Sequence, residues 1–153
     1  MVDLTNRIQH KSIREQLEIL AGEFPGRVVF TTSFGMEDQV ITHFIFENNI
    51  PVEVVTLDTG RLFPETYKVF SETVSRYQKK IVAYFPDQQA VEKMVTEKGP
   101  FSFYHSKDNR HECCHIRKVV PLSRALQDKS CWISGIRADQ SDSRSQMKNL
   151  EFD

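Results

Sequence analysis

The sequence predicts an α/β domain in which helices flank a mainly parallel β-sheet. Short β-branched runs alternate along the chain with longer segments whose apolar residues recur at helical spacing. Strands and helices that alternate in this way form folds with a parallel sheet between helical layers. The length of 153 residues is also sufficient for one domain with its own hydrophobic core.

The first strand of this sheet is predicted at residues 28–32, between two helices. Before it, the apolar residues of the segment 4–20 lie at roughly helical spacing, and a Pro-Gly pair ends the pattern. The strand is β-branched and leads into a Ser-Phe-Gly loop, as expected for a buried strand. Beyond that loop, the apolar residues at 40–45 share one face of a helix.

The next two strands are predicted at residues 52–57 and 81–85. Pro64 suits the first turn of the helix between them, in which apolar residues are spaced three and four apart up to Tyr77. The run at 81–85 is closed by a proline, which cannot continue a central strand.

The last predicted strand covers residues 131–136 and follows two further helices. The first helix contains the periodic apolar residues of 90–95 and ends at a Gly-Pro pair. The second covers about 114–127 and is interrupted or restarted at Pro121. Residues 101–112 are polar, aromatic and without periodicity, so we interpret them as a loop.

Net charge and hydropathy exclude several classes of function. The formal net charge of −1 gives no bulk attraction to nucleic acid or to an anionic membrane, so an anionic substrate needs a local cluster of Arg and Lys. No apolar run approaches the length of a membrane span, and the charged N-terminus is unlike a secretory signal. A cytoplasmic location is the default expectation.

Three strand ends carry residues that can bind an anion or a nucleotide. Ligands of open parallel sheets bind at the carboxyl ends of the strands. There, glycine permits close approach of the backbone, helix N-termini offer unpaired N–H groups, and arginine can hold a phosphate or sulfate. Taken singly, each segment is explained more simply as a strand-to-helix turn or as solvated surface arginines. The segments are Ser33–Asp38, Leu57–Gly60, and Gly135–Arg137 with Gln140 and Arg144.

The adjacent cysteines Cys113 and Cys114, followed by Arg117 and Lys118, are the most specific feature. A disulfide between neighbours would close a strained ring, so the pair indicates free thiols or metal thiolates. Vicinal thiolates can each bind a different iron of a cluster, and nearby cations would lower the pKa of the thiols. The alternative is a chance pair of small buried residues. For Cys131, which lies inside a hydrophobic strand, the core interpretation is the stronger one.

Taken together, four blocks of sequence resemble the assimilatory adenylyl-sulfate and phosphoadenylyl-sulfate reductases. They occur in the family's order over residues 28–144, which is more specific than any one block. The first block looks like a modified PP-loop, related to that of ATP pyrophosphatases, with Phe34 where those enzymes usually have glycine. The blocks are Thr32–Asp38, Leu57–Gly60 with Pro64–Thr66, Cys113–Leu122 with Arg124–Leu126, and Trp132–Arg137 with Gln140, Ser141 and Arg144.

The resemblance implies an adenine nucleotide α-hydrolase-like (PP-loop) domain over residues 26–153, preceded by an N-terminal helical segment at 1–25. It implies thioredoxin-dependent reduction of adenylyl sulfate, or of phosphoadenylyl sulfate, to sulfite in sulfate assimilation. Cys113 and Cys114 would bind a [4Fe-4S] cluster, and Lys118 would lie between this cluster and the anionic groups of the substrate. The other residues expected to bind the substrate are Ser33, Gly35, Leu57, Asp58, Thr59, Gly60, Gly135, Arg137, Gln140 and Arg144.

Two features of the resembled family are absent from the sequence. It contains neither a second pair, Cys-x-x-Cys, nor the Glu-Cys-Gly-Leu-His tail whose thiolate attacks the sulfate sulfur. Truncation just after Arg144 would explain both absences, so we expect a chain that is incomplete at its C-terminus and inactive alone. A PP-loop ATP pyrophosphatase and a non-catalytic adenine-nucleotide-binding module stay open as alternatives. Self-association through an unfinished sheet edge stays open as well.

Overall fold

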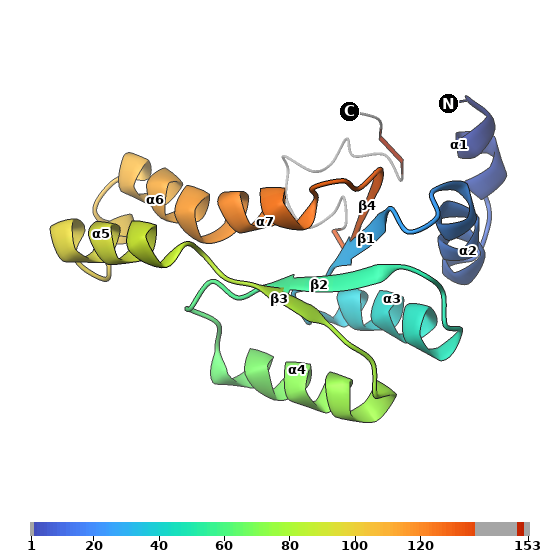
Figure 1. Ribbon diagram of the computed structural model, residues 1–153, viewed down its shortest axis with the longest axis horizontal. Helices are drawn as coiled ribbons and strands as arrows, with labels where there is room; N and C mark the ends of the chain where they lie inside the picture. Colours follow the sequence, from blue (N-terminus) through green and yellow to red (C-terminus); the bar gives the residue numbers. More distant parts are fainter. Residues whose placement is uncertain (1, 137–149, 152–153) are drawn as a thin grey trace.

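The computed structural model, which describes residues 2–136 and 150–151, contains a four-stranded parallel sheet flanked by helices (Figure 1). The strand order is β3-β2-β1-β4, and each strand coincides with a predicted run. The predicted fold class and the four predicted strands are confirmed. The strands are β1 Val28–Thr31, β2 Glu53–Leu57, β3 Val82–Tyr84 and β4 Cys131–Ser134.

The chain reverses its direction across the sheet after β3. Strands β1, β2 and β3 follow one another outward, and the chain then returns so that β4 pairs with the other side of β1. Val28 pairs with Cys131 and Thr31 with Ser134, so β1 and β4 end level with each other. In open parallel sheets, ligands bind at the carboxyl ends of the strands where the order reverses. The topology therefore predicts a ligand site at the loops that follow β1 and β4.

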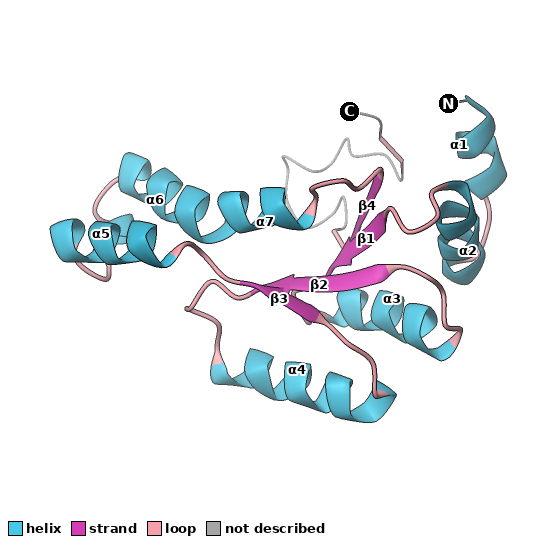
Figure 2. Ribbon diagram, viewed as in Figure 1, coloured by secondary structure: helices cyan, strands magenta, loops and turns pink. Residues whose placement is uncertain are grey.

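Helices cover both faces of the sheet (Figure 2). On one side, α2 Ile13–Glu23 and α3 Met36–Glu47 pack against the strands, and α4 Pro64–Tyr77 lies beside α3. On the other side lie α5 Gln88–Lys98 and α7 Val120–Ala125. Within the described residues, no helix is long and apolar enough to span a bilayer. The remaining helical segments are α1 Val2–Ile8, the 3₁₀ turn Ser102–Tyr104, α6 Lys107–Cys114 and the π-helical turn His115–Val119.

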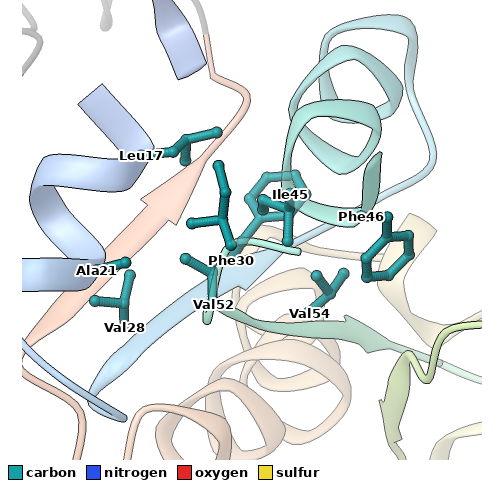
Figure 3. Close-up of a cluster of buried hydrophobic side chains, with 9 residues drawn as sticks. Leu17, Ala21, Val28, Phe30, Ile45, Phe46, Val52 and Val54 are labelled. Atoms are coloured by element: carbon teal, nitrogen blue, oxygen red, sulfur yellow. The ribbon is translucent and has the colours of Figure 1, made fainter. Parts of the chain in front are cut away.

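Strand β1 is buried on both of its faces. On one face, Phe30 packs in a cluster with Ile45 of α3 and Leu17 of α2 (Figure 3). On the other face, Val29 is buried in a cluster with Ala125 of α7. A strand that is covered on both sides has no polar face, which explains why residues 28–31 form a continuous apolar run ending in threonine rather than an alternating one.

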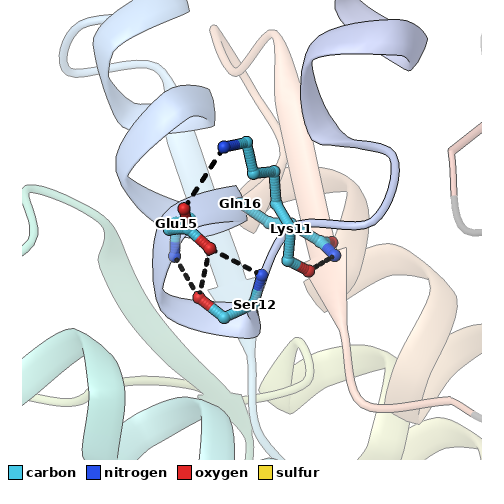
Figure 4. Close-up of polar contacts among 4 residues, drawn as sticks. All are labelled: Lys11, Ser12, Glu15 and Gln16. Carbon is cyan, nitrogen blue, oxygen red and sulfur yellow. Dashed lines mark hydrogen bonds and ion pairs between the residues drawn. The ribbon is translucent and has the colours of Figure 1, made fainter.

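The predicted single helix over residues 4–20 is wrong, because the structure contains two helices there. His10 adopts a left-handed conformation with φ of 62°, and Ser12 then caps α2. The Glu15 N–H donates to Ser12 Oγ, and the Ser12 N–H donates to the Glu15 carboxylate at 2.9 Å (Figure 4). Hydrogen bonds from the backbone and side chain of Ser12 lower the pKa of Glu15 to about 2. This capping box satisfies two backbone N–H groups at the start of α2 and begins a new helix in the middle of the apolar pattern.

The predicted loop at 101–112 is also wrong, since this segment contains a 3₁₀ turn and the helix α6. Ser106 caps α6 by accepting a hydrogen bond from the Asn109 N–H at 3.1 Å. Phe103 and Tyr104 contact each other, with ring centroids 4.4 Å apart. A helix cap and aromatic contacts stabilise this segment, and it has no stripe of periodic apolar residues. Helical periodicity in the sequence therefore could not predict it.

The predicted interruption of the helix near Pro121 is confirmed and takes the form of a π-helical turn. Helix α6 continues through residues 115–119 into α7 without a break in the chain direction. Proline has no N–H, and its ring collides with the carbonyl oxygen four residues earlier, which here belongs to Arg117. The widened turn accommodates this collision, and such turns are frequent at functional sites.

The capping box predicts the effect of one substitution on stability. We expect Ser12→Ala to lower the free energy of unfolding by about 1 kcal/mol, because the hydrogen bonds of the Ser12 hydroxyl with the Glu15 N–H and carboxylate are lost. Urea unfolding followed by circular dichroism measures the change. Ser71→Ala, on the exposed surface of α4, is the matched control and should change stability by less than about 0.5 kcal/mol. Equal effects for the two variants would contradict a special role for the cap.

Candidate functional site

The loops that follow β1, β2 and β4 meet at the carboxyl edge of the sheet. Residues 32–35 link β1 to α3, residues 58–60 follow β2, and residues 135–136 follow β4. Leu57 is the last residue of β2 and is half-buried. The structure thus brings together the predicted site residues Ser33, Gly35, Asp58, Thr59, Gly60 and Gly135. The predicted residues Arg137, Gln140 and Arg144 lie outside the described part of the chain.

The β1–α3 loop is closed by hydrogen bonds to its own side chains. The backbone N–H of Ser33 donates to Asp38 Oδ2 at 2.6 Å, and the Ser33 hydroxyl donates to the same oxygen at 2.7 Å. The Phe34 N–H donates to Thr32 Oγ1 at 3.0 Å. Asp38 is buried in the first turn of α3, where the helix N-terminus stabilises a negative charge.

Phe34 takes a conformation that a bulky residue adopts only when its surroundings compensate the strain. Its φ is 63°, in the left-handed region, and its side chain is buried. The ring stacks on Phe70 of α4, with centroids 4.8 Å apart. Burial and stacking of the ring stabilise this backbone conformation and attach the loop to α4.

Gly135 packs directly on Asp38. A Cβ added to this glycine would collide with Asp38 Oδ1 and would lie 3.1 Å from Asp38 Cγ and 3.2 Å from the Asp38 backbone nitrogen. Two of these three atoms belong to a buried side chain and the third to the backbone, so none can move aside easily. Only glycine fits between the end of β4 and the first turn of α3.

The loop after β2 is shaped by Asp58, which is buried. Asp58 Oδ1 accepts a hydrogen bond from the Gly60 N–H at 2.9 Å, and the Tyr67 hydroxyl donates to both carboxylate oxygens. The hydrogen bond to Asp58 is the main reason that the pKa of Tyr67 is raised. Gly60 has a φ of 70°, which favours glycine. The Asp58 carboxylate therefore holds the Asp-Thr-Gly turn in shape.

Arg117 connects the π-helical turn to the same loop. Its side chain is buried, and Nη1 donates to the Thr59 carbonyl oxygen at 2.6 Å. Nε is buried as well and, in the part of the chain that the structure describes, has no hydrogen-bond partner. A buried guanidinium with a single backbone acceptor and no carboxylate partner among those residues is suited to an anionic group.

Cys113 and Cys114 lie at the end of α6, one buried and the other exposed. Neighbouring helical side chains point in directions roughly 100° apart, so the two sulfurs do not converge on one metal ion. Among the described residues, no group of three or more His, Cys, Asp or Glu side chains could hold a metal. The donor set fits two corners of a cluster that four thiolates hold.

The other predicted residues of the site lie in different places. Lys118 is exposed on the π-helical turn, next to Arg117. Cys131 begins β4, opposite Val28, and thus lies at the amino end of the sheet, away from the loops described above. Burial raises the pKa of its thiol. The predicted core role of Cys131 agrees with its contacts to the apolar clusters.

Three residues of this edge, Asp38, Tyr67 and Arg117, were not among the predicted substrate-binding residues. Arg117 was predicted only as a cation beside the cysteine pair. Asp38 carried a signal, since an acidic residue in the first turn of a helix after a glycine loop is a typical capping position. Tyr67 carried none, because its hydroxyl reaches Asp58 only in the folded chain. A groove of about 640 Å³ lies between α3 and α4 and is lined by none of the predicted site residues.

Comparison with known proteins identifies the family. The sequence profile of the phosphoadenosine phosphosulfate reductase domain matches residues 27–153. The chain belongs to this family. Its fold agrees, because the crystal structure of a phosphoadenylyl-sulfate (PAPS) reductase from Candida auris, a phosphate complex, superimposes with a TM-score of 0.75 at 25% sequence identity. That similarity covers 88% of this chain and 66% of the fungal one.

Reductase relatives of bacteria and plants match almost the whole chain. Adenosine 5'-phosphosulfate reductase of Agrobacterium fabrum is 44% identical over 90% of this chain and 53% of its own length. The enzyme of the same name from Sinorhizobium fredii is 43% identical over 98% of this chain and 59% of its own length. The chloroplastic 5'-adenylylsulfate reductase 3 of Arabidopsis thaliana is 38% identical over 99% of this chain and 32% of its own length. The chain thus spans between a third and three fifths of the length of these relatives.

The packing of Gly135 on Asp38 predicts a strong effect of a single methyl group. We expect Gly135→Ala to lower the free energy of unfolding by about 1–3 kcal/mol, because the added atom overpacks a buried contact. Gly22→Ala is the matched control, since nothing lies within 4 Å of a Cβ there. The control should be neutral or stabilising, by up to about 1 kcal/mol, because glycine is a poor helix former. Urea midpoints of both variants decide whether the contact forms.

Proposed function

We propose that this chain is the nucleotide-binding part of a reductase that converts adenylyl sulfate, or phosphoadenylyl sulfate, to sulfite and the corresponding nucleotide. The nucleotide would bind at the carboxyl edge of the sheet, between the loops at 32–35, 58–60 and 135–136. Membership of the phosphoadenosine phosphosulfate reductase family and the names of the bacterial relatives support this proposal.

The observation that carries the proposal is the hydrogen bond between Arg117 Nη1 and the Thr59 carbonyl oxygen. It connects the Cys-Cys-x-x-Arg-Lys segment to the Asp-Thr-Gly loop, although the two are 58 residues apart in the sequence. A cationic group between a thiol pair and a nucleotide loop suits a substrate whose reacting end is an anion. A PP-loop ATP pyrophosphatase requires neither the cysteine pair nor this contact, so the geometry favours the reductase.

We assign the substrate's groups to three sets of residues. Leu57, Thr59 and the backbone around Gly60 would contact the adenosine, while Ser33, Gly35 and Gly135 would line the other side of the site. Arg117 and Lys118 would face the phosphate and sulfate, together with Arg137, Gln140 and Arg144. Asp58 would act by holding the shape of the loop, since its carboxylate already accepts hydrogen bonds from the Gly60 N–H and the Tyr67 hydroxyl.

We also propose that Cys113 and Cys114 supply two thiolates to a [4Fe-4S] cluster, with thioredoxin as the electron donor of the reaction. When bound, the cluster would supply an iron–sulfur group whose charge the neighbouring cations offset. The position of the two sulfurs at the start of the π-helical turn supports this assignment, because Arg117 and Lys118 follow within one turn.

None of the three cysteines is suited to attack the sulfate sulfur. Cys131 lies at the amino end of the sheet, and its raised pKa disfavours the nucleophilic thiolate at neutral pH. Cys113 is buried, and Cys114 lies beside it on the same rigid helix. A transferable sulfur needs a mobile thiolate that can meet the substrate and then thioredoxin. We therefore place the nucleophile on a segment that this sequence does not contain.

Nucleotide binding tests the proposal directly. We expect calorimetric titration to show that AMP and adenylyl sulfate bind the chain more tightly than ATP does. Arg117→Lys should weaken binding of adenylyl sulfate by about tenfold, because lysine lacks the planar fork that spans Thr59 and an anion. Arg110→Lys, at an exposed position of α6, is the matched control and should bind as the unchanged chain does. A clear preference for ATP would support the pyrophosphatase hypothesis.

Sulfite release tests the assignment of the cysteines. We expect the chain with adenylyl sulfate and reduced thioredoxin to release no sulfite above the rate without protein, because loss of a covalent nucleophile costs many orders of magnitude. The chain without thioredoxin and thioredoxin without the chain are the controls. Turnover that disappears in Cys113→Ser, Cys114→Ser or Cys131→Ser would show that one of these residues is the nucleophile.

A further inference from the structure

Asp38 is a buried carboxylate at the place where the strand order reverses. Its exposed fraction is 6%, and within the described residues no basic side chain forms an ion pair with it. Its charge is stabilised by the Ser33 donors and by the N-terminus of α3. Burying a carboxylate without a basic partner costs free energy, and these hydrogen bonds and the helix N-terminus offset that cost.

The hydrogen bonds of Asp38 consume donors that a bound phosphate would need. In loops that bind a phosphate at a helix N-terminus, the backbone N–H groups point at the ligand. Here the Ser33 N–H and hydroxyl both donate to Asp38 Oδ2, and the Phe34 N–H donates to Thr32 Oγ1. The loop therefore already holds an anion, which is its own side chain.

The remaining space around this carboxylate is filled by Gly135. Asp38 Oδ1 lies where a side chain at position 135 would begin. The Asp38 carboxylate is thus enclosed by the first turn of its own helix, α3, on one side and by Gly135, which follows β4, on the other. A second anion in the same position would meet both steric overlap and a negative charge at short distance.

We propose that Asp38 determines the specificity of the site by occupying the anion position of the β1–α3 loop. The loop rejects a polyphosphate chain, and the site admits a nucleotide whose anionic end is bound by cations from other segments. Arg117 is such a cation, because its Nε is buried and has no hydrogen-bond partner among the residues that the structure describes. This inference rests on the proposed nucleotide site and adds the residue that separates adenylyl sulfate from ATP.

Two substitutions at Asp38 separate the contribution of charge from that of volume. Asp38→Asn removes the charge and keeps the shape, while Asp38→Ser also frees space and the Ser33 donors. The probes are inorganic pyrophosphate and ATP in metal-free buffer, with AMP titrated in parallel. We expect one or both variants to bind pyrophosphate and ATP at least about tenfold more tightly than the unchanged chain, since a like charge at contact distance is removed. AMP affinity should change much less.

Glu37→Gln is the matched control, because it removes a neighbouring carboxylate of the first turn of α3 without altering position 38. It should leave the affinity for pyrophosphate unchanged. No gain in either Asp38 variant would overturn the proposal, and so would an equal gain in Glu37→Gln. Failure of the unchanged chain to bind AMP would count against the proposed function, whereas the pyrophosphate titrations decide the role of Asp38 independently.

A measurement on the unchanged chain covers the case in which both Asp38 variants fail to fold. Backbone amide signals of Ser33 and Phe34 are followed by NMR as pyrophosphate is added. We expect these signals to stay in place, because their N–H groups are already engaged. Saturable shifts of both amides would show that pyrophosphate displaces the internal carboxylate, and the proposal would be wrong.

Discussion

Strand β1 lies between β2 and β4, and its hydrogen bonds to both strands determine where the loops that follow them can meet. Because all three strands run parallel, their carboxyl ends lie at one edge of the sheet. The burial of Val29 and Phe30 on opposite faces keeps β1 in this central position. The contacts between Asp38 and Gly135, and between Arg117 and the Asp-Thr-Gly loop, are possible only with this strand order.

The site is held by polar contacts that are buried or partly buried. Asp38 accepts from Ser33, Asp58 accepts from Gly60 and Tyr67, and Arg117 donates to a backbone carbonyl. Each contact restrains the backbone of a loop before any ligand binds. Less conformational entropy is therefore lost when a ligand orders the site. Within the described part of the chain, Arg117 Nε stays without a hydrogen-bond partner, and this feature favours an anionic ligand.

The strands and most helices could be predicted because their signals are local. The run at 28–31 is apolar and β-branched, and α4 begins at a proline and shows regular spacing. The two errors arose where local signals conflict with the apolar pattern. A capping box at Ser12 divides one periodic segment into two helices, and α6 forms without an apolar stripe because Ser106 caps it and aromatic residues precede it.

The sequence by itself determined the fold class, the four strands and the segments that carry the chemistry, since these depend on composition and short-range spacing. It also identified the family, because four motifs occur in one order. Only the tertiary structure decided how these segments meet. The pairing of β4 with β1, the packing of Gly135 on Asp38 and the reach of Arg117 to Thr59 join residues 58 or more apart in the chain. Contacts of this kind depend on strand order and side-chain direction, which no local pattern encodes.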